Sequence, residues 1–116
     1  MNGQISSLDE FWPFYVSQHL NPGNRRLHFA GTTFGVLLAV LALVLRTPLF
    51  GAVAFIVAYG FAWVGHFGFE RNRPATFQYP WLSFLADFRM YRLIATGRMD
   101  AEISRLAPEL KRLRAS

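Results

Sequence analysis

The sequence predicts an all-α integral membrane protein built on a helical hairpin of two transmembrane helices. Two apolar runs indicate the hairpin. No charged residue occurs between Phe29 and Leu45, and His66 is the only readily ionisable residue between Thr47 and Phe69. At about 1.5 Å per residue these runs span roughly 26 and 34 Å, against roughly 30 Å of bilayer hydrocarbon. The alternative is a pair of buried helices in a soluble bundle, but such helices seldom lack charge on every face.

Capping and breaking residues give the expected elements in order. Ser7 and Glu10 have capping-box spacing at the start of the first helix. Thr47 suits the cap and Pro48 the first position of the second span, and Gly97 suits the end of a later helix. Together they form one membrane domain of 116 residues, with a shallow third insertion as a further possibility. The expected elements are an interfacial helix over 7–20, span 1 over 25–45, span 2 over 48–72, an amphipathic helix on the membrane surface over 81–97, and a basic helical tail over 99–116 that is interrupted by Pro108.

The net charge of +5 comes from eleven Arg and one Lys, which raises nucleic acid as a partner. The positions of the arginines indicate membrane topology instead. Arg25 and Arg26 precede the first span, Arg71 and Arg73 follow the second, and only Arg46 lies in the short connection. This positive-inside pattern predicts that both ends are cytoplasmic and that anionic lipid headgroups, not nucleic acid, face these charges. The bias of Arg over Lys suggests a GC-rich bacterial genome, so a bacterial inner membrane is the expected location.

Counting outward from the connection brings the histidines to one level. His28 lies 18 residues before Arg46, and His66 lies 18 residues after Pro48. Two antiparallel helices therefore place both about 27 Å from the turn, near the cytoplasmic end of the hairpin. His19 lies nine residues before His28 and reaches the same level if the first helix folds back onto the membrane surface. All three histidines of the chain are thus expected to converge.

A metal site is one interpretation of this convergence. Glu70 lies one turn beyond His66 and faces the same side. Imidazoles and a carboxylate, in a chain without cysteine, suit non-haem iron or zinc. Glu70 could ligate the metal or accept the far ring proton of a ligating histidine. The alternatives are contact of the histidines with headgroups and pairing of Glu70 with Arg73 or Arg26.

Other polar residues could serve a substrate. Arg73 lies near the expected position of an anionic head, and a guanidinium binds a carboxylate bidentately. Asn24 and Asn72 could donate further hydrogen bonds to that substrate. Asp87 could ligate metal, hold an arginine or face water, and a salt bridge is the role we expect.

Two segments carry a family resemblance. HLNPGNRRLH (19–28) followed by WVGHFGFERNRPA (63–75) resembles the membrane 2-hydroxy fatty acid dioxygenases, over roughly residues 11 to 91. The pairing of the two segments is more specific than either alone. The resemblance implies an Fe(II)-dependent dioxygenase that shortens 2-hydroxy fatty acids by one carbon, with histidines essential for iron. The matching histidines are His19, His28 and His66, and the other matching polar residues are Glu70, Arg73, Asn21 and Asn24.

We therefore expect a membrane enzyme of fatty acid α-oxidation that binds Fe²⁺ and converts a 2-hydroxy fatty acid and O₂ to the shorter acid and CO₂. Glu70 and Arg73 are its candidate catalytic residues. A small transporter is one alternative, but it needs an ionisable group in mid-membrane, which neither span has. A non-catalytic scaffold with a structural metal is another, but it leaves the convergence of the histidines unexplained. Because one hairpin encloses little, a homo-oligomer is also expected.

Overall fold

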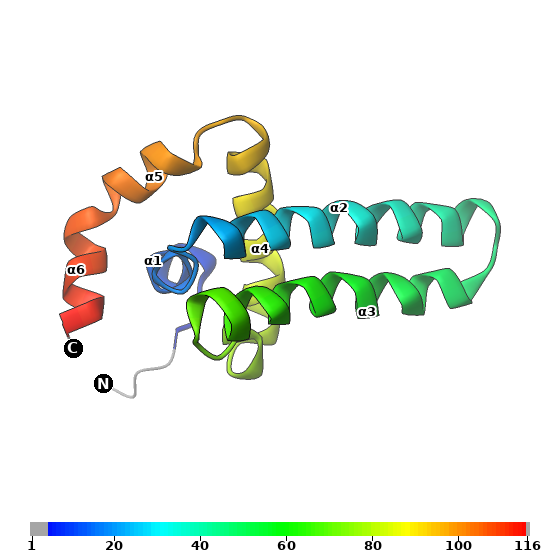
Figure 1. The fold of residues 1–116 in the computed structure, drawn as a ribbon, viewed down its shortest axis with the longest axis horizontal. Helices are drawn as coiled ribbons and strands as arrows, with labels where there is room; N and C mark the ends of the chain where they lie inside the picture. The colour runs from blue at the N-terminus through cyan, green and yellow to red at the C-terminus, as the bar shows by residue number, and fades with distance from the viewer. Residues whose placement is uncertain (1–4, 116) are drawn as a thin grey trace. The chain divides into compact units, whose positions relative to one another are not determined.

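The computed structural model describes residues 5–115, in which every regular element is a helix (Figure 1). The all-α prediction is therefore confirmed for the described residues. The chain divides into two compact units. One runs from Asn21 to Asn72 and is called the hairpin unit below. The other comprises the chain up to Leu20 and from Arg73 onward, and is called the four-helix unit.

The hairpin unit consists of two antiparallel helices that lie side by side, α2 (Pro22–Val44) and α3 (Pro48–Val64), followed by the π-helical segment η1 (Gly65–Glu70) (Figure 1). The Asn21 side chain caps α2 by accepting a hydrogen bond from the Gly23 amide at 2.8 Å. Because Asn21 caps and proline favours the first helical position, α2 begins earlier than the expected residue 25.

The connection between α2 and α3 turns at Arg46, whose φ of 51° lies in the left-handed region. Thr47 occupies the N-cap position of α3, as predicted, and proline follows it. The Thr47 hydroxyl, however, donates to the Leu45 carbonyl at 3.1 Å instead of accepting an amide hydrogen bond. The predicted capping residue is therefore in place without its capping bond.

The helices Pro22–Val44 and Pro48–Glu70 are long and apolar enough to cross a membrane. Only 17% of the apolar window of each is buried inside the chain. Large side chains therefore point outward, such as Leu43, which is 79% exposed, and Ile56, which is 71% exposed. A surface this apolar needs a non-aqueous neighbour.

Two glycines of α2 allow the hairpin to close. A Cβ at Gly31 would lie 2.7 Å from the Cβ of Phe61 and 3.1 Å from the carbonyl oxygen of Ala58. A Cβ at Gly35 would lie 3.2 Å from the Cβ of Ala58. Small residues at such positions let helix backbones approach closely, and Gly31 lies one turn beyond His28.

The four-helix unit is built around a core of buried apolar side chains from all of its helices, among them Phe11, Met90 and Leu110. Ser7 caps its first helix, and its hydroxyl accepts from the Glu10 amide at 3.2 Å, which confirms half of the predicted capping box. The elements are α1 (Leu8–Ser17), the 3₁₀ turn η2 (Ala75–Phe77), α4 (Pro80–Ala95), α5 (Met99–Arg105) and α6 (Ala107–Ala115). Within the described residues the tail is helical, and α5 and α6 are separated at Leu106, two residues before Pro108.

The last turn of α4 ends as the sequence predicts. Gly97 adopts a φ of +71°, which favours glycine, and the Arg98 amide donates to the Leu93 carbonyl at 2.8 Å. Trp81, Phe84 and Phe88 lie on the outer face of α4, where Trp81 is 65% exposed and stacks on Phe84. Ser83, Ala86 and Met90 are buried on its inner face, so the helix carries an aromatic stripe outward.

Asp87 has a partner that the sequence did not predict. We expected a salt bridge, but its carboxylate accepts a hydrogen bond from the hydroxyl of Tyr15, which comes from α1. Arg89, two residues further on, bonds instead to Asp9 at 3.1 Å. Asp87 lies on the side of α4 that packs against α1, where the Tyr15 hydroxyl reaches it.

We expect Gly31→Ala to lower the free energy of unfolding by about 1–3 kcal/mol, because the added methyl group would force α2 away from Phe61. The measurement is the thermal unfolding midpoint in detergent micelles. Gly60→Ala is the matched control, since a Cβ there meets nothing within 4 Å. Its midpoint should stay level or rise slightly, because alanine favours the helix. A Gly31→Ala midpoint equal to that of Gly60→Ala would contradict the close-packing argument.

The Asp87 carboxyl should make stability depend on pH. Burial raises the pKa of Asp87 from 3.8 to about 7, outweighing the Tyr15 hydrogen bond, which lowers it. Between about pH 4 and pH 7 the folded protein then holds a proton that the unfolded chain has lost, so stability falls as pH rises. The slope due to this one group is at most about 1.4 kcal/mol per pH unit. Asp87→Asn should remove that part of the slope in thermal unfolding, and an identical slope in both proteins would refute it.

Candidate metal centre

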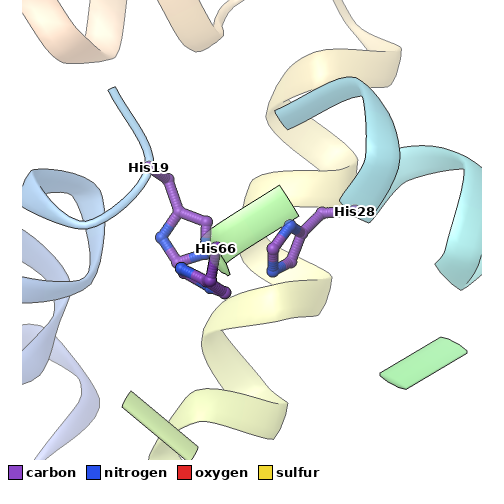
Figure 2. A group of neighbouring side chains, drawn as sticks. All are labelled: His19, His28 and His66. Carbon is purple, nitrogen blue, oxygen red and sulfur yellow. The ribbon is translucent and has the colours of Figure 1, made fainter. Parts of the chain in front are cut away.

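Three buried histidines form a group that could hold a metal ion. His19, His28 and His66 are 1%, 6% and 2% exposed, and one ligand atom from each lies within 4.8 Å of the others (Figure 2). The convergence that we expected from counting residues is therefore found.

Two of these histidines belong to the hairpin unit. His28 lies on α2 and His66 on η1. Their rings meet edge to face, with centroids 4.9 Å apart and planes at 90°. The two histidines lie equally far from the turn on antiparallel helices, and their imidazoles therefore meet, as the spacing predicts.

His19 is linked closely to this pair by the chain itself. It follows α1, and only Leu20 separates it from Asn21, where the hairpin unit begins. The Asn21 amide donates to the Glu70 carboxylate, and its side chain caps α2. Two Cα steps of about 3.8 Å therefore keep the Cα of His19 within about 8 Å of the Cα of Asn21.

The hydrogen bonds of the three rings select one tautomer. In each ring Nδ1 lies at hydrogen-bond distance from a carbonyl oxygen. The pairs are His19 with the Tyr15 main chain at 2.6 Å, His28 with the Asn24 main chain at 3.0 Å, and His66 with the Asn72 side chain at 2.7 Å. Because a carbonyl oxygen only accepts, each Nδ1 donates and carries the proton. Nε2 of each neutral ring then carries the lone pair that a metal requires.

Two of these bonds reach the carbonyl four residues earlier. For His28 the helix α2 places that carbonyl on the same side, whereas His19 makes its bond from just beyond the end of α1. The Tyr15 carbonyl is one of the last four of α1, which ends at Ser17, and it accepts from the Gln18 amide at 3.0 Å in place of a regular i+4 partner. A carbonyl oxygen has two lone pairs, so it can also accept from the His19 ring.

His66 is held by an irregular turn. The π-helical segment η1 (Gly65–Glu70) ends at Arg71, which adopts a left-handed φ of 59°. The His66 carbonyl accepts hydrogen bonds from the amides of Arg71 and Asn72, the second at 3.0 Å. The chain thereby curls back, and the Asn72 side chain reaches the His66 ring. Turns of this kind are rare in helices and frequent at functional sites.

Gly65 is required beside this turn. A Cβ at Gly65 would overlap the Asn24 side-chain oxygen and would lie 3.0 Å from Asn24 Cγ. Asn24 is completely buried. The absence of a side chain at Gly65 therefore lets α2 and η1 approach at the level of the histidines.

Glu70 joins η1 to the start of α2. Its Oε1 accepts from the Asn21 amide and from Asn24 Nδ2, the latter at 3.4 Å. A carboxylate is favourable there because the N-terminus of a helix carries partial positive charge. Glu70 is not in the group of three histidines, and its role as a direct ligand remains a prediction.

The predicted substrate-binding residues lie in two kinds of position. The guanidinium of Arg73 is exposed and lies over the Phe77 ring, 5.3 Å from its centroid. Asn24 and Asn72 each hold a histidine, the first through its main-chain carbonyl and the second through its side chain. Substrate binding by these three residues remains a prediction.

Sequence reasoning missed the part played by Tyr15. Its ring stacks on the His19 imidazole, with centroids 4.0 Å apart and planes at 21°. The signal was the spacing, because Tyr15 precedes His19 by four residues at the end of a helix. The π-helical turn has no comparable signal, although Gly65 directly before His66 marks a close backbone approach.

Three neutral imidazoles without a thiolate suit a divalent first-row metal such as iron or zinc. With all three Nδ1 protons directed to oxygen acceptors, the donor set fits such an ion without any rearrangement of tautomers.

Comparison with known proteins bears on the nature of this centre. The model of one protein family, described as 2-hydroxy-palmitic acid dioxygenase Mpo1-like, matches residues 5–99. Neither the curated proteins nor the solved structures yield a match. The matched segment contains all three histidines and most of the chain, and it confirms the resemblance of the two histidine-containing segments. The chain therefore belongs to the Mpo1-like family.

Proposed function

We propose that the protein is an Fe(II)-dependent dioxygenase that converts a 2-hydroxy fatty acid and O₂ into the fatty acid one carbon shorter, CO₂ and water. The observation that carries this proposal is the group of three buried histidines in a chain that belongs to a dioxygenase family. The bond between C1 and C2 of the substrate breaks, C1 leaves as CO₂, and C2 becomes the new carboxyl carbon. The substrate supplies all four electrons that reduce O₂, so no separate reductant is required.

His19, His28 and His66 would hold the iron through Nε2, and three protein ligands leave positions for substrate. Bound Fe(II) supplies the redox chemistry that allows O₂ to react with the 2-hydroxy acid. The main-chain carbonyls of Tyr15 and Asn24 and the Asn72 side chain keep the three rings in the ligating tautomer.

Other residues would bind and orient. The exposed Arg73 follows Asn72 directly and could pair with the substrate carboxylate bidentately. Glu70 would keep His66 and His28 in register through its bonds to Asn21 and Asn24. Direct ligation by Glu70 would require those bonds to be exchanged for the metal, so we favour the positioning role.

The apolar hairpin supports a membrane location. Each candidate span is only 17% buried within the chain, whereas a core helix of a soluble protein is mostly buried. The substrate's acyl tail would lie along this outward apolar surface, in the bilayer or between copies of the chain. Arg25 and Arg26 near the start of α2 and Arg71 directly after η1 favour cytoplasmic ends, in a bacterial inner membrane.

We expect protein purified without oxygen to contain iron and to convert 2-hydroxypalmitate to pentadecanoate and CO₂. His66→Ala should lower iron affinity and turnover by about tenfold or more. Phe67→Ala is the matched control, because this neighbouring side chain is 53% exposed, and it should retain both. Elemental analysis and chromatography of the products are the measurements. Wild-type protein with bound metal but no turnover would favour the scaffold with a structural metal, and full iron and activity in His66→Ala would remove His66 from the site.

We expect Gly65→Ala to lower the iron content, because its methyl group would displace Asn24, which supports His28. Gly68→Ala lies in the same π-helical segment, and its Cβ would meet only Val64 Cγ1 at 4.0 Å. This control should therefore retain its iron. Both variants are compared by metal analysis after verification that they elute as monodisperse species from a sizing column. Equal iron in the two variants would contradict a specific requirement for glycine at position 65.

A further inference from the structure

We propose that Tyr15 and Asp87 form a clamp that orients His19 for metal binding. In this role they are positioning residues, which act on the metal through His19 and do not touch it. The inference rests on the proposed function, since it assigns a task to two residues outside the set of predicted ligands.

The first part of the clamp is the double contact of Tyr15 with His19. The two rings stack with centroids 4.0 Å apart, and His19 Nδ1 donates to the Tyr15 carbonyl at 2.6 Å. One contact fixes the plane of the imidazole, and the other fixes which nitrogen carries the proton. His19 lies beyond Ser17, the last residue of α1, so regular helical packing does not hold its side chain. Tyr15 therefore sets both properties that a ligating histidine needs.

The second part of the clamp is the bond that holds Tyr15. The Tyr15 hydroxyl donates to the Asp87 carboxylate on α4, 72 residues later in the chain. Trp12 stacks on Tyr15 with centroids 5.6 Å apart, and the bond to Asp87 holds the tip of the tyrosine ring. Burial of a carboxyl group is costly unless it is hydrogen-bonded. A phenylalanine against an apolar side chain would fill this space without that cost, so the polar pair indicates a role beyond packing.

A purely structural tie between two helices is the alternative, and the same unit provides its control. Trp12 Nε1 donates to Glu102 Oε2 at 2.6 Å and thereby links α1 to α5. Both bonds connect an aromatic side chain of α1 to a carboxylate of another helix: the Trp12 indole to Glu102, and the Tyr15 hydroxyl to Asp87. The Trp12–Glu102 bond does not involve the residue that contacts His19. Loss of either tie should lower stability, but only loss of the clamp should alter metal binding.

The experiment compares the metal-free full chain as wild type, Tyr15→Phe, Asp87→Leu, Asp87→Asn and Glu102→Leu. Each protein is titrated with Co²⁺, and the visible absorption of the bound ion reports affinity and coordination. Tyr15→Phe and Asp87→Leu should lower the affinity by about tenfold and change the spectrum, as loss of an outer-shell partner does. Asp87→Asn keeps an oxygen acceptor for the Tyr15 hydroxyl and should restore wild-type binding. Glu102→Leu should bind as wild type even if its thermal midpoint falls.

The outcomes separate this inference from the proposed function. Wild-type affinity in Tyr15→Phe and Asp87→Leu, with binding lost in His66→Ala, would overturn the clamp and leave the metal centre standing. Equal weakening in Glu102→Leu would also overturn the clamp, because it would attribute the effect to stability alone.

Failure of the wild type to bind Co²⁺ would instead count against the metal centre. Proton NMR of the His19 ring in the metal-free proteins then decides the clamp by itself, because the stacked Tyr15 ring shifts these resonances. Wild type and Asp87→Asn should give the same His19 ring shifts, whereas Tyr15→Phe and Asp87→Leu should move them toward those of an unstacked imidazole. Wild-type shifts in all the proteins would refute the clamp.

Discussion

The candidate centre depends on one constraint, which is that the Nδ1–H group of each buried histidine donates a hydrogen bond to a carbonyl oxygen. A neutral imidazole with this proton placed has a single nitrogen left for a metal, and its direction is fixed by the same bond. A different local feature supplies the acceptor for each ring. It is the end of α1 for His19, the carbonyl four residues earlier in α2 for His28, and the turn after η1, which brings back the Asn72 side chain, for His66. Local backbone geometry thus orients all three rings.

The features predictable from the sequence were those that follow from periodicity and from chain length. The two apolar runs, the proline and glycine boundaries and the equal distances of His28 and His66 from the turn all depend on the rise of a regular helix. The family resemblance could be recognised because the two histidine-containing segments carry most of the distinctive polar residues. For these features, local sequence is sufficient.

The features that escaped prediction depend on contacts between segments far apart in the chain or on departure from regular geometry. Asp87 meets Tyr15 only because α1 packs on α4, so its partner could not be derived from neighbouring residues. The bonds of Glu70 to the start of α2 were not predicted either, because regular helical spacing gave only its position one turn beyond His66. The chain is π-helical there, so the α-helical repeat does not fix where this carboxylate points.

That change of repeat has a consequence for how such a site arises. A π-helical turn accommodates one more residue than an α-helical turn, so it corresponds to a single insertion in an otherwise regular span. Each residue of an α-helix advances the side chains by about 100° around the axis. Removal of one residue from η1 would therefore leave the length of the apolar helix nearly unchanged while rotating Asn72 to a different face from His66. The difference between an inert apolar helix and one that presents an oriented imidazole is then as small as one codon.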